Sequence, residues 1–207
     1  MRKILVLCSG GFDSILMLHT LASNLNTNDE IHTLFFDYGQ KSASQERECV
    51  VKASEELDCI FHEIVLPKFD WTAGEFYSEK FSGDGEYLEM RNLIFISYAL
   101  SVCESLGLSH LYMAILKSYG YYDTSYDFIS KVRSIALDKN IYFETPFSMF
   151  EKEDLVSLAY RKELKTSDFH SCDNPVEGKP CGECPDCIAL KEIFSVLGNN
   201  TTNPIDL

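Results

Sequence analysis

The sequence is short of basic side chains. Its 207 residues include 18 Lys and Arg against 32 Asp and Glu, which gives a formal net charge of -14. Proteins whose main partner is nucleic acid usually present a basic face, because neutralising phosphates dominates their affinity. The acidic balance therefore weighs against a nucleic-acid partner, but it leaves room for a local basic pocket around a nucleotide.

The sequence also lacks long apolar runs, internal repeats and low-complexity segments. No run approaches the ~20 apolar residues that span a bilayer. The N-terminus is not a signal peptide, because its apolar stretch is short and Ser9-Gly10-Gly11 interrupts it. We therefore expect a first core strand there, no membrane partner, and a cytoplasmic location by default. A hydrophobic fraction of 45% predicts a globular domain with a full core.

Strands and helices alternate along the chain, which predicts an α/β fold with a doubly wound parallel sheet. Strands are expected at Ile4–Cys8, Ile31–Phe36, Ile60–Leu66, His110–Leu116 and Tyr142–Glu144. Helices are expected at Asp13–Leu25, about 43–57, Arg91–Leu106, from about 127 to Asn140, Glu151–Lys162 (with Ser148 as its N-cap) and Ile188–Leu197. Ligands of such sheets bind beyond the carboxyl ends of the strands, so the loops there should line one site.

A short glycine-containing loop, Ser9 to Ser14, falls between the first strand and the first helix. Gly10 and Gly11 let the backbone approach phosphates, and the helix N-terminus adds a positive dipole end. Asp13 would repel a phosphate unless Mg²⁺ lay between them. The loop lacks the spacing and lysine of a Walker A motif and is no GxGxxG fingerprint. A tight turn with an Asp or Ser N-cap remains the alternative.

Three further polar residues have two interpretations each. Asp37, at the end of the second strand, can cap a helix or contact Mg²⁺ or ribose. Lys41 can touch phosphate or stay solvated on its helix. His170 is a candidate for proton transfer or a pocket residue.

Eight cysteines divide into two groups. Four are dispersed through expected strands and helices and read as small buried hydrophobes. The other four crowd near the C-terminus as Cys172-x8-Cys181-x2-Cys184-x2-Cys187. Four thiolates suit a closed, structural Zn²⁺ site, and an iron–sulfur cluster is the rival interpretation. Disulfides are disfavoured in a protein expected in the cytosol.

These features divide the chain into three parts. Residues 1–165 form the expected ATP-binding α/β domain, and 67–89 within it, rich in Gly and acidic groups, form an irregular insertion that could serve as a lid or interface arm. Residues 166–198 form a small zinc-binding C-terminal segment. Residues 199–207 form a polar tail.

The motifs together resemble the 7-cyano-7-deazaguanine synthase (QueC) family of PP-loop ATP pyrophosphatases, whose fold is like that of the adenine nucleotide alpha hydrolases. The resemblance covers nearly the whole chain and is carried by Ser9–Ser14, Phe36–Gln40, Arg91–Phe95, Glu144–Phe147, Ser171-Cys172 and Lys179–Cys187. It implies an ATP-dependent carbon–nitrogen ligase that adenylates 7-carboxy-7-deazaguanine and uses ammonia to make an amide and then the nitrile (preQ0), in queuosine biosynthesis. It also implies Mg²⁺, structural Zn²⁺ and a homodimer.

The resemblance carries over roles for individual residues. It puts the phosphates and Mg²⁺ on Ser9, Gly10, Gly11, Asp13 and Ser14, and the metal on the four clustered cysteines. It puts Arg91 and Asn92 near the phosphate and the substrate carboxylate, and Lys117 is a candidate to stabilise the acyl-adenylate. Asp123 is the candidate to read the guanine-like edge, and Tyr122, in an aromatic loop with Tyr119 and Tyr121, is a candidate to stack on the ring. An aromatic loop that merely packs on the core is the alternative.

The sequence departs from the family pattern at several positions. Lys41-Ser42 stands where the family usually has Arg-His, Met90 where it has Ala, and Thr124-Ser125 where it has Cys-Arg. These departures raise a second hypothesis, a variant like those of antiphage operons that stops at an amide and uses a protein amine. A third hypothesis is a PP-loop enzyme that modifies tRNA, and a fourth is a nucleotide sensor without catalysis, against which the intact Asp13 and Ser14 argue.

Overall fold

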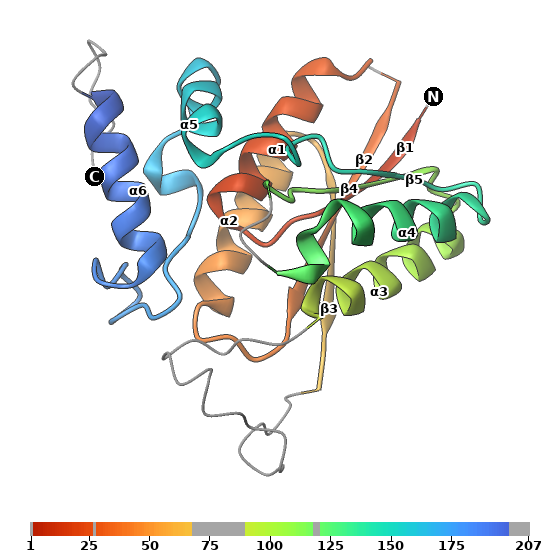
Figure 1. Ribbon diagram of the computed structural model, residues 1–207, viewed down its shortest axis with the longest axis horizontal. Coiled ribbons are helices and arrows are strands. Elements are labelled where there is room, and N and C mark those ends of the chain that lie inside the picture. Colours follow the sequence, from red (N-terminus) through yellow and green to blue (C-terminus); the bar gives the residue numbers. More distant parts are fainter. Residues whose placement is uncertain (1, 27, 68–89, 118–120, 199–207) are drawn as a thin grey trace.

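The protein is a parallel five-stranded sheet covered by helices on both faces (Figure 1). The computed structural model describes residues 2–26, 28–67, 90–117 and 121–198, with residues 192–198 described by their backbone alone. The strands are β1 (Lys3–Leu7), β2 (Glu30–Asp37), β3 (Ile60–Val65), β4 (His110–Met113) and β5 (Tyr142–Glu144). They pair in the order β3-β2-β1-β4-β5, and every pair is parallel. The predicted α/β fold is confirmed.

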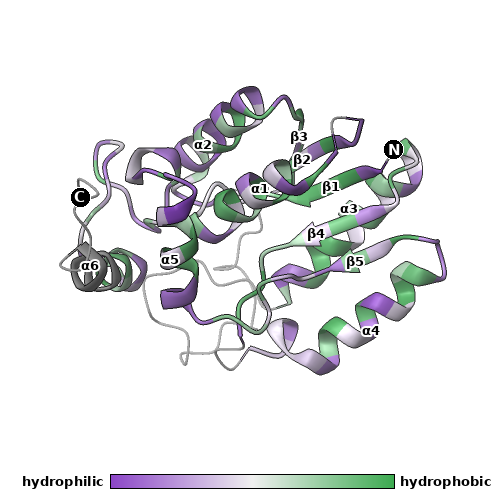
Figure 2. Cartoon of the chain, turned by 90° about the horizontal axis from the view of Figure 1, so that it is seen from above, coloured by the Kyte–Doolittle hydropathy of each residue, from purple (hydrophilic) through white to green (hydrophobic). Residues whose placement is uncertain are grey.

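Strand β1 is buried on both faces and divides the core in two. Ile4 and Val6 face one core cluster with helices α1, α2 and α5, whereas Leu5 and Leu7 face a second cluster with α3 and α4. The helices are α1 (Phe12–Asn24), α2 (Ala43–Glu56), α3 (Arg91–Leu106), α4 (Tyr126–Leu137), α5 (Lys152–Arg161) and α6 (Pro185–Gly198). Figure 2 shows apolar colour concentrated along β1 and on helix faces toward the sheet. Successive apolar side chains of β1 point to opposite faces of the sheet, so this one strand packs against both layers of helices.

The strand order changes direction at β1. From β1 the chain proceeds to β2 and β3 on one side, and later to β4 and β5 on the other. Leu7, the last residue of β1, lies in register with Leu34 of β2 and Met113 of β4. The loop that follows β1 therefore opens at a topological switch point, where doubly wound sheets bind their ligands.

The C-terminal segment folds back against the loop that follows β1. After a short 3-10 turn at Thr166–Asp168, the chain passes the start of α1, and α6 then packs beside α5 (Figure 1). No helix in the described part of the chain is both long and apolar enough to cross a membrane. The expected insertion falls almost wholly, and the tail wholly, outside the described residues.

Several sequence-based details were wrong. The fourth strand ends at Met113 and not at Leu116. The N-cap of α5 is Glu151, whose capping box with Asp154 replaces the expected one led by Ser148. Helix α6 starts at Pro185, because a proline is well suited to the first turn of a helix.

Helix α3 covers one face of the sheet as an outer layer. Only Ile96, Ala99 and Cys103 of this helix are buried, and Leu93 and Tyr98 are among its exposed residues.

Candidate functional site

The loop after β1 has the close-packed backbone that its two glycines predict. Gly10 adopts a left-handed conformation with φ of 81°, and a Cβ there would overlap the backbone carbonyl of Glu46 in α2. A Cβ on Gly11 would lie 3.3 Å from Ser9 Oγ and 3.8 Å from the carbonyl oxygen of His170. The loop is thus held between α2 and the C-terminal segment, and any larger residue at position 10 would displace it.

The serine hydroxyls of the loop bond to one another and to its backbone. Ser14 Oγ donates to the Gly11 carbonyl at 3.0 Å and accepts from the Ser9 amide at 3.2 Å. The hydroxyls of Ser9 and Ser14 lie 3.2 Å apart, and Ser9 Oγ accepts from the Gly11 amide at 3.3 Å. These groups can exchange their mutual hydrogen bonds for phosphate oxygens without moving the chain, as a pyrophosphate cradle requires.

Asp13 is paired with a lysine that sequence reasoning missed. Lys152 Nζ donates to Asp13 Oδ2 at 3.2 Å and lies 5.7 Å from the centroid of the Phe12 ring. The other oxygen, Asp13 Oδ1, is buried and has no hydrogen-bond partner among the described residues. Burial raises the pKa of Asp13, and the Lys152 charge opposes that rise. A buried carboxylate oxygen without a partner beside the glycine loop fits a divalent cation.

Lys152 could have been found only through the fold. It is the first residue of α5, and that helix follows β5 at the carboxyl edge of the sheet, where ligands bind. In the sequence it is the only lysine of α5, and it stands 139 positions from Asp13. Its cation lies where it can neutralise either Asp13 or a phosphate.

Side-chain hydrogen bonds shape the segment after β2. Asp37 Oδ1 accepts from the Gly39 amide at 2.9 Å and so closes a turn, whereas the N-cap position of α2 is Ser42, so Asp37 does not cap that helix. Glu46, which sequence reasoning also missed, accepts from Gln40 Nε2 at 2.9 Å and from Ser42 Oγ at 2.7 Å. Burial raises the pKa of Glu46. Glu46 therefore ties the Gln40 turn to the helix that supports Gly10.

Arg91, the first residue of α3, points across the site toward the end of β2. Its Nη1 donates to Tyr38 Oη at 2.9 Å, and its guanidinium lies 5.7 Å and 6.0 Å from the ring centroids of Tyr38 and Phe95. The charges of Glu46 and Asp173 act on the same region. This places a fixed cation between the loop after β2 and the C-terminal segment, with acidic groups near it.

Asp123 and Asn92, both of which are predicted to contact the substrate, lie next to each other. Asp123 is buried, with 5% of its surface exposed, and its Oδ2 accepts from the Asn92 backbone amide at 3.1 Å. The Asn92 side chain donates back to the Asp123 carbonyl at 3.2 Å. One oxygen of Asp123 thus caps α3. Tyr122 is 49% exposed and bonds to Asp127 and Lys131, so the described structure holds its ring at the surface.

Three other candidates lie outside this group. Lys41 donates to Asn174 Oδ1 at 3.0 Å, which links the turn before α2 to the C-terminal segment. Lys117 is exposed and pairs with Glu151 at 2.6 Å. His170 is buried, its Nε2 lies 3.0 Å from the Cys172 carbonyl oxygen, and burial lowers its pKa. Tyr119 lies outside the described residues.

The four C-terminal cysteines converge on one point. Their sulfur atoms all lie within 4.8 Å of one another, close to the roughly 3.8 Å separation of four thiolates around Zn²⁺. The Cys181 amide donates to Cys172 Sγ at 3.2 Å, and the Cys184 amide donates to Cys181 Sγ at 3.3 Å. Backbone amides lower the pKa of Cys181 to about 7. The donor set fits a thiophilic metal with no open ligand position.

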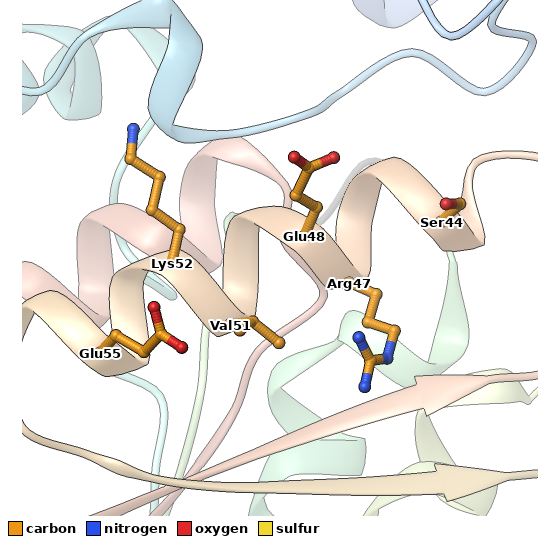
Figure 3. A pocket seen from close by; sticks show the side chains of 6 residues that line it. All are labelled: Ser44, Arg47, Glu48, Val51, Lys52 and Glu55. Carbon is orange, nitrogen blue, oxygen red and sulfur yellow. The ribbon is translucent and has the colours of Figure 1, made fainter.

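A shallow hollow lies away from these residues, on the outer side of α2 (Figure 3). It is lined by Ser44, Arg47, Glu48, Val51, Lys52 and Glu55. Arg47 bonds to Glu63 and Lys52 to Asp168, so its cations are already paired. The hollow includes none of the predicted site residues.

Solved structures share this fold. One is described as "U34-tRNA thiolase NcsA from Methanococcus maripaludis with its [4Fe-4S] cluster"; it is 15% identical with a TM-score of 0.52, over 97% of this chain and 67% of that chain. Another, a 4-thiouridine synthetase in complex with RNA and ATP, is 16% identical with a TM-score of 0.56, over 94% of this chain and 50% of that one. These likenesses show that the chain has the fold of these two enzymes.

The family is shown by sequence. The family model "Queuosine biosynthesis protein QueC" matches residues 3–198, and the chain belongs to this family. A relative from Leptospira biflexa, named 7-cyano-7-deazaguanine synthase, is 28% identical over 95% of this chain and 92% of its own length.

Proposed function

We propose that the protein is an ATP-dependent ligase that activates the carboxylate of 7-carboxy-7-deazaguanine and joins it to ammonia. A carboxylate oxygen attacks the α-phosphorus of ATP, and pyrophosphate leaves. Ammonia then attacks the acyl carbon, and AMP leaves with the former carboxylate oxygen, which gives an amide. A second ATP activates the amide oxygen in the same way, and loss of AMP and protons gives the nitrile. The phosphate loop packed between α2 and the C-terminal segment is the observation that carries this proposal.

The loop residues divide the work of binding the nucleotide. Ser9, Gly10, Gly11 and Ser14 supply hydroxyl and amide donors for the phosphates at the positive end of α1. Asp13 offers a buried oxygen for Mg²⁺, which when bound would neutralise charge on the departing pyrophosphate. The Lys152 charge opposes the rise that burial causes in the pKa of Asp13, and it adds a cation at the same edge.

The substrate half of the site uses Arg91, Asn92 and Asp123. Arg91 binds the carboxylate or the adenylate phosphate, because its guanidinium is fixed by Tyr38 and has donors to spare. Asp123 reads the amino edge of the deazaguanine with the oxygen that does not cap α3. Tyr122 and Lys117 complete this half, with Asp37 and Lys41 as supports of the nucleotide side. The proposal includes a Zn²⁺ on the four cysteines, a homodimer and a cytoplasmic location.

A variant reaction that stops at an amide with a protein amine is the second candidate. Thr124 and Ser125 stand where the family has Cys-Arg, and both are occupied: Thr124 Oγ1 donates to the Tyr121 carbonyl, and Ser125 Oγ caps α4 at Phe128. Neither side chain carries the positive charge of the arginine in the family pattern. This loss of charge favours a different nitrogen donor.

A tRNA thiolase is less well supported. Cys8, the cysteine next to the loop, is buried, and burial raises its pKa to about 11. A thiol of this kind is a poor nucleophile at neutral pH. The net charge of -14 also disfavours tRNA binding. Tight binding of tRNA in a filter assay at low salt would revive this function.

Mass spectrometry tests the proposal. The protein is incubated with 7-carboxy-7-deazaguanine, ATP, Mg²⁺ and ammonia, and the products are compared with those of Asp13→Ala. Amide and nitrile from the wild type alone support the main function. An amide that accumulates without nitrile favours the variant reaction. Absence of both, with pyrophosphate release equal to that of Asp13→Ala, would contradict the proposal and favour a sensor.

A further inference from the structure

The segment that leads into the metal cluster also touches the phosphate loop. Residues His170–Cys172, here called the strap, run directly beside Gly10, Gly11 and Phe12. The last residue of the strap, Cys172, is one of the four clustered cysteines. The strap therefore connects the metal cluster to the nucleotide loop through two peptide bonds.

Ser171 supplies the cap that α1 lacks from its own sequence. The N-cap position is Gly11, which has no side chain, so the first amides of the helix need other acceptors. The Phe12 amide donates to Ser171 Oγ at 3.2 Å, across 159 positions of sequence. A hydroxyl in this position fixes the first turn of the helix whose N-terminus faces the phosphates.

The backbone and ring on either side of Ser171 are fixed as well. The His170 amide donates to the Gly10 carbonyl at 2.8 Å, and the Phe169 ring packs edge-on against Phe12 with centroids 5.1 Å apart. Contacts therefore hold the chain both before and after Gly11. Because Gly10 has the left-handed conformation and Gly11 bears no Cβ, these contacts replace the side-chain restraint that other residues would provide.

We infer that Ser171 is a positioning residue of the nucleotide site, and that metal bound at Cys172 sets the affinity for ATP through it. The inference rests on the proposed role of the phosphate loop. Metal binding would fix Cys172, which holds Ser171 against Phe12 and His170 against Gly10. Without metal, Cys172 is no longer fixed, and the strap no longer holds the phosphate loop in place. Part of the free energy of ATP binding is then used to order the loop, so the affinity for ATP falls.

This coupling is reciprocal. If metal strengthens ATP binding by some factor, ATP must strengthen metal binding by the same factor. A purely structural metal, independent of the loop, would show no such factor. The reciprocity gives a readout that does not depend on catalysis.

The first test compares Ser171→Ala with Ser171→Thr, which keeps the hydroxyl, and with Ser167→Ala, which removes an exposed hydroxyl of the same segment. Calorimetry with Mg²⁺ and the slow analogue α,β-methylene-ATP should show binding weakened about fivefold to tenfold in Ser171→Ala only, as expected for loss of a helix cap. KM for ATP should rise by a similar factor while kcat at saturating ATP changes less than about twofold. Equal metal content among the variants, by elemental analysis, separates this effect from metal loss.

The second test measures Zn²⁺ affinity by competition with a chromophoric chelator, with and without α,β-methylene-ATP. Tighter Zn²⁺ binding in the presence of the analogue, reduced in Ser171→Ala, is the expected result. Equal Zn²⁺ affinity with and without the analogue, or unchanged analogue binding in Ser171→Ala, would overturn the inference. A wild-type protein that binds no ATP analogue at all would instead contradict the proposed function.

Discussion

The phosphate loop and the turn at Tyr122–Thr124 both border the carboxyl edge of the sheet, but they are built differently. The loop is confined by α2, by the strap and by Lys152. In the turn, Asp123 is buried against Asn92, while Tyr121 and Tyr122 are exposed. The part proposed to activate an acid is preorganised, whereas the part proposed to recognise the base depends on one buried carboxylate.

This difference parallels the motif pattern. The loop carries the complete family motif, and the turn carries Thr124-Ser125 where the family has Cys-Arg. Donors that are already in place stabilise the charge that develops on the transferring phosphate without having to reorganise. Because the turn is separate from the loop, a residue change in the turn can alter substrate choice and leave these donors undisturbed. Variants in each region should therefore affect different steps.

Gly10→Ala should have the largest effect. The added Cβ would meet the Glu46 backbone in a left-handed conformation, so the loop must shift. We expect loss of detectable ATP binding and a destabilisation of about 3 kcal/mol, typical of overpacking with backbone strain. Calorimetry and urea denaturation measure both.

Gly107→Ala is the matched control. Gly107 also has a left-handed conformation, but a Cβ there meets nothing within 4 Å. It should cost about 1 kcal/mol, the strain alone, and leave ATP binding intact. Equal effects of the two substitutions would show that the loop is not close-packed.

Asp123→Asn should come next, with an effect on one substrate only. An amide cannot both cap α3 and accept from the donors of a guanine-like edge in the same way. We expect kcat/KM for 7-carboxy-7-deazaguanine to fall about 100-fold, as for sites that read a polar group, while KM for ATP changes less than about twofold. Tyr122→Phe, which keeps the exposed ring, is the control. A parallel loss of ATP affinity would remove the distinction between the two regions.

Lys152→Met should have a smaller effect that is confined to the phosphate side. Without Lys152, the mostly buried Asp13 carboxylate has no cation beside it. We expect the free energy of unfolding to fall by about 1–2 kcal/mol, and no more, because the carboxylate retains some contact with solvent. Pyrophosphate release should fall about tenfold to 50-fold, the range for loss of one charged group near a transferring phosphate. Lys152→Arg should recover part of the rate. Full activity in Lys152→Met would mean that the lysine is only structural.

The smallest effect concerns pH and stability. Burial raises the pKa of Asp13, so the folded form holds its proton more tightly than the unfolded chain does. Stability therefore falls as pH rises from the ordinary value of about 3.9 through the raised pKa. Asn does not titrate, so the gain in unfolding free energy of Asp13→Asn over wild type should grow across this window and then level off. Urea denaturation at several pH values would contradict this if the gain stayed constant or shrank.

Local sequence predicted the parts whose geometry is local. The glycines after β1, the strand alternation and the cysteine spacing each dictate a turn, a sheet or a cluster from neighbouring residues, and the structure has all three. The pairs Asp13–Lys152, Phe12–Ser171 and Asn92–Asp123 join residues far apart in sequence. Their partners follow only from the packing of α5, the strap and α3. Ser148 failed as a cap because Glu151, nearer the helix, caps its amides instead.

The most direct test of the account follows one oxygen atom. The protein is given ATP, ammonia and 7-carboxy-7-deazaguanine whose carboxylate carries ¹⁸O, and the AMP formed is analysed by mass spectrometry. If the carboxylate attacks the α-phosphorus, one ¹⁸O passes into AMP when ammonia displaces it. The account predicts AMP with one labelled oxygen, and none from Asp13→Ala. Product amide formed together with unlabelled AMP would contradict adenylation of the carboxylate.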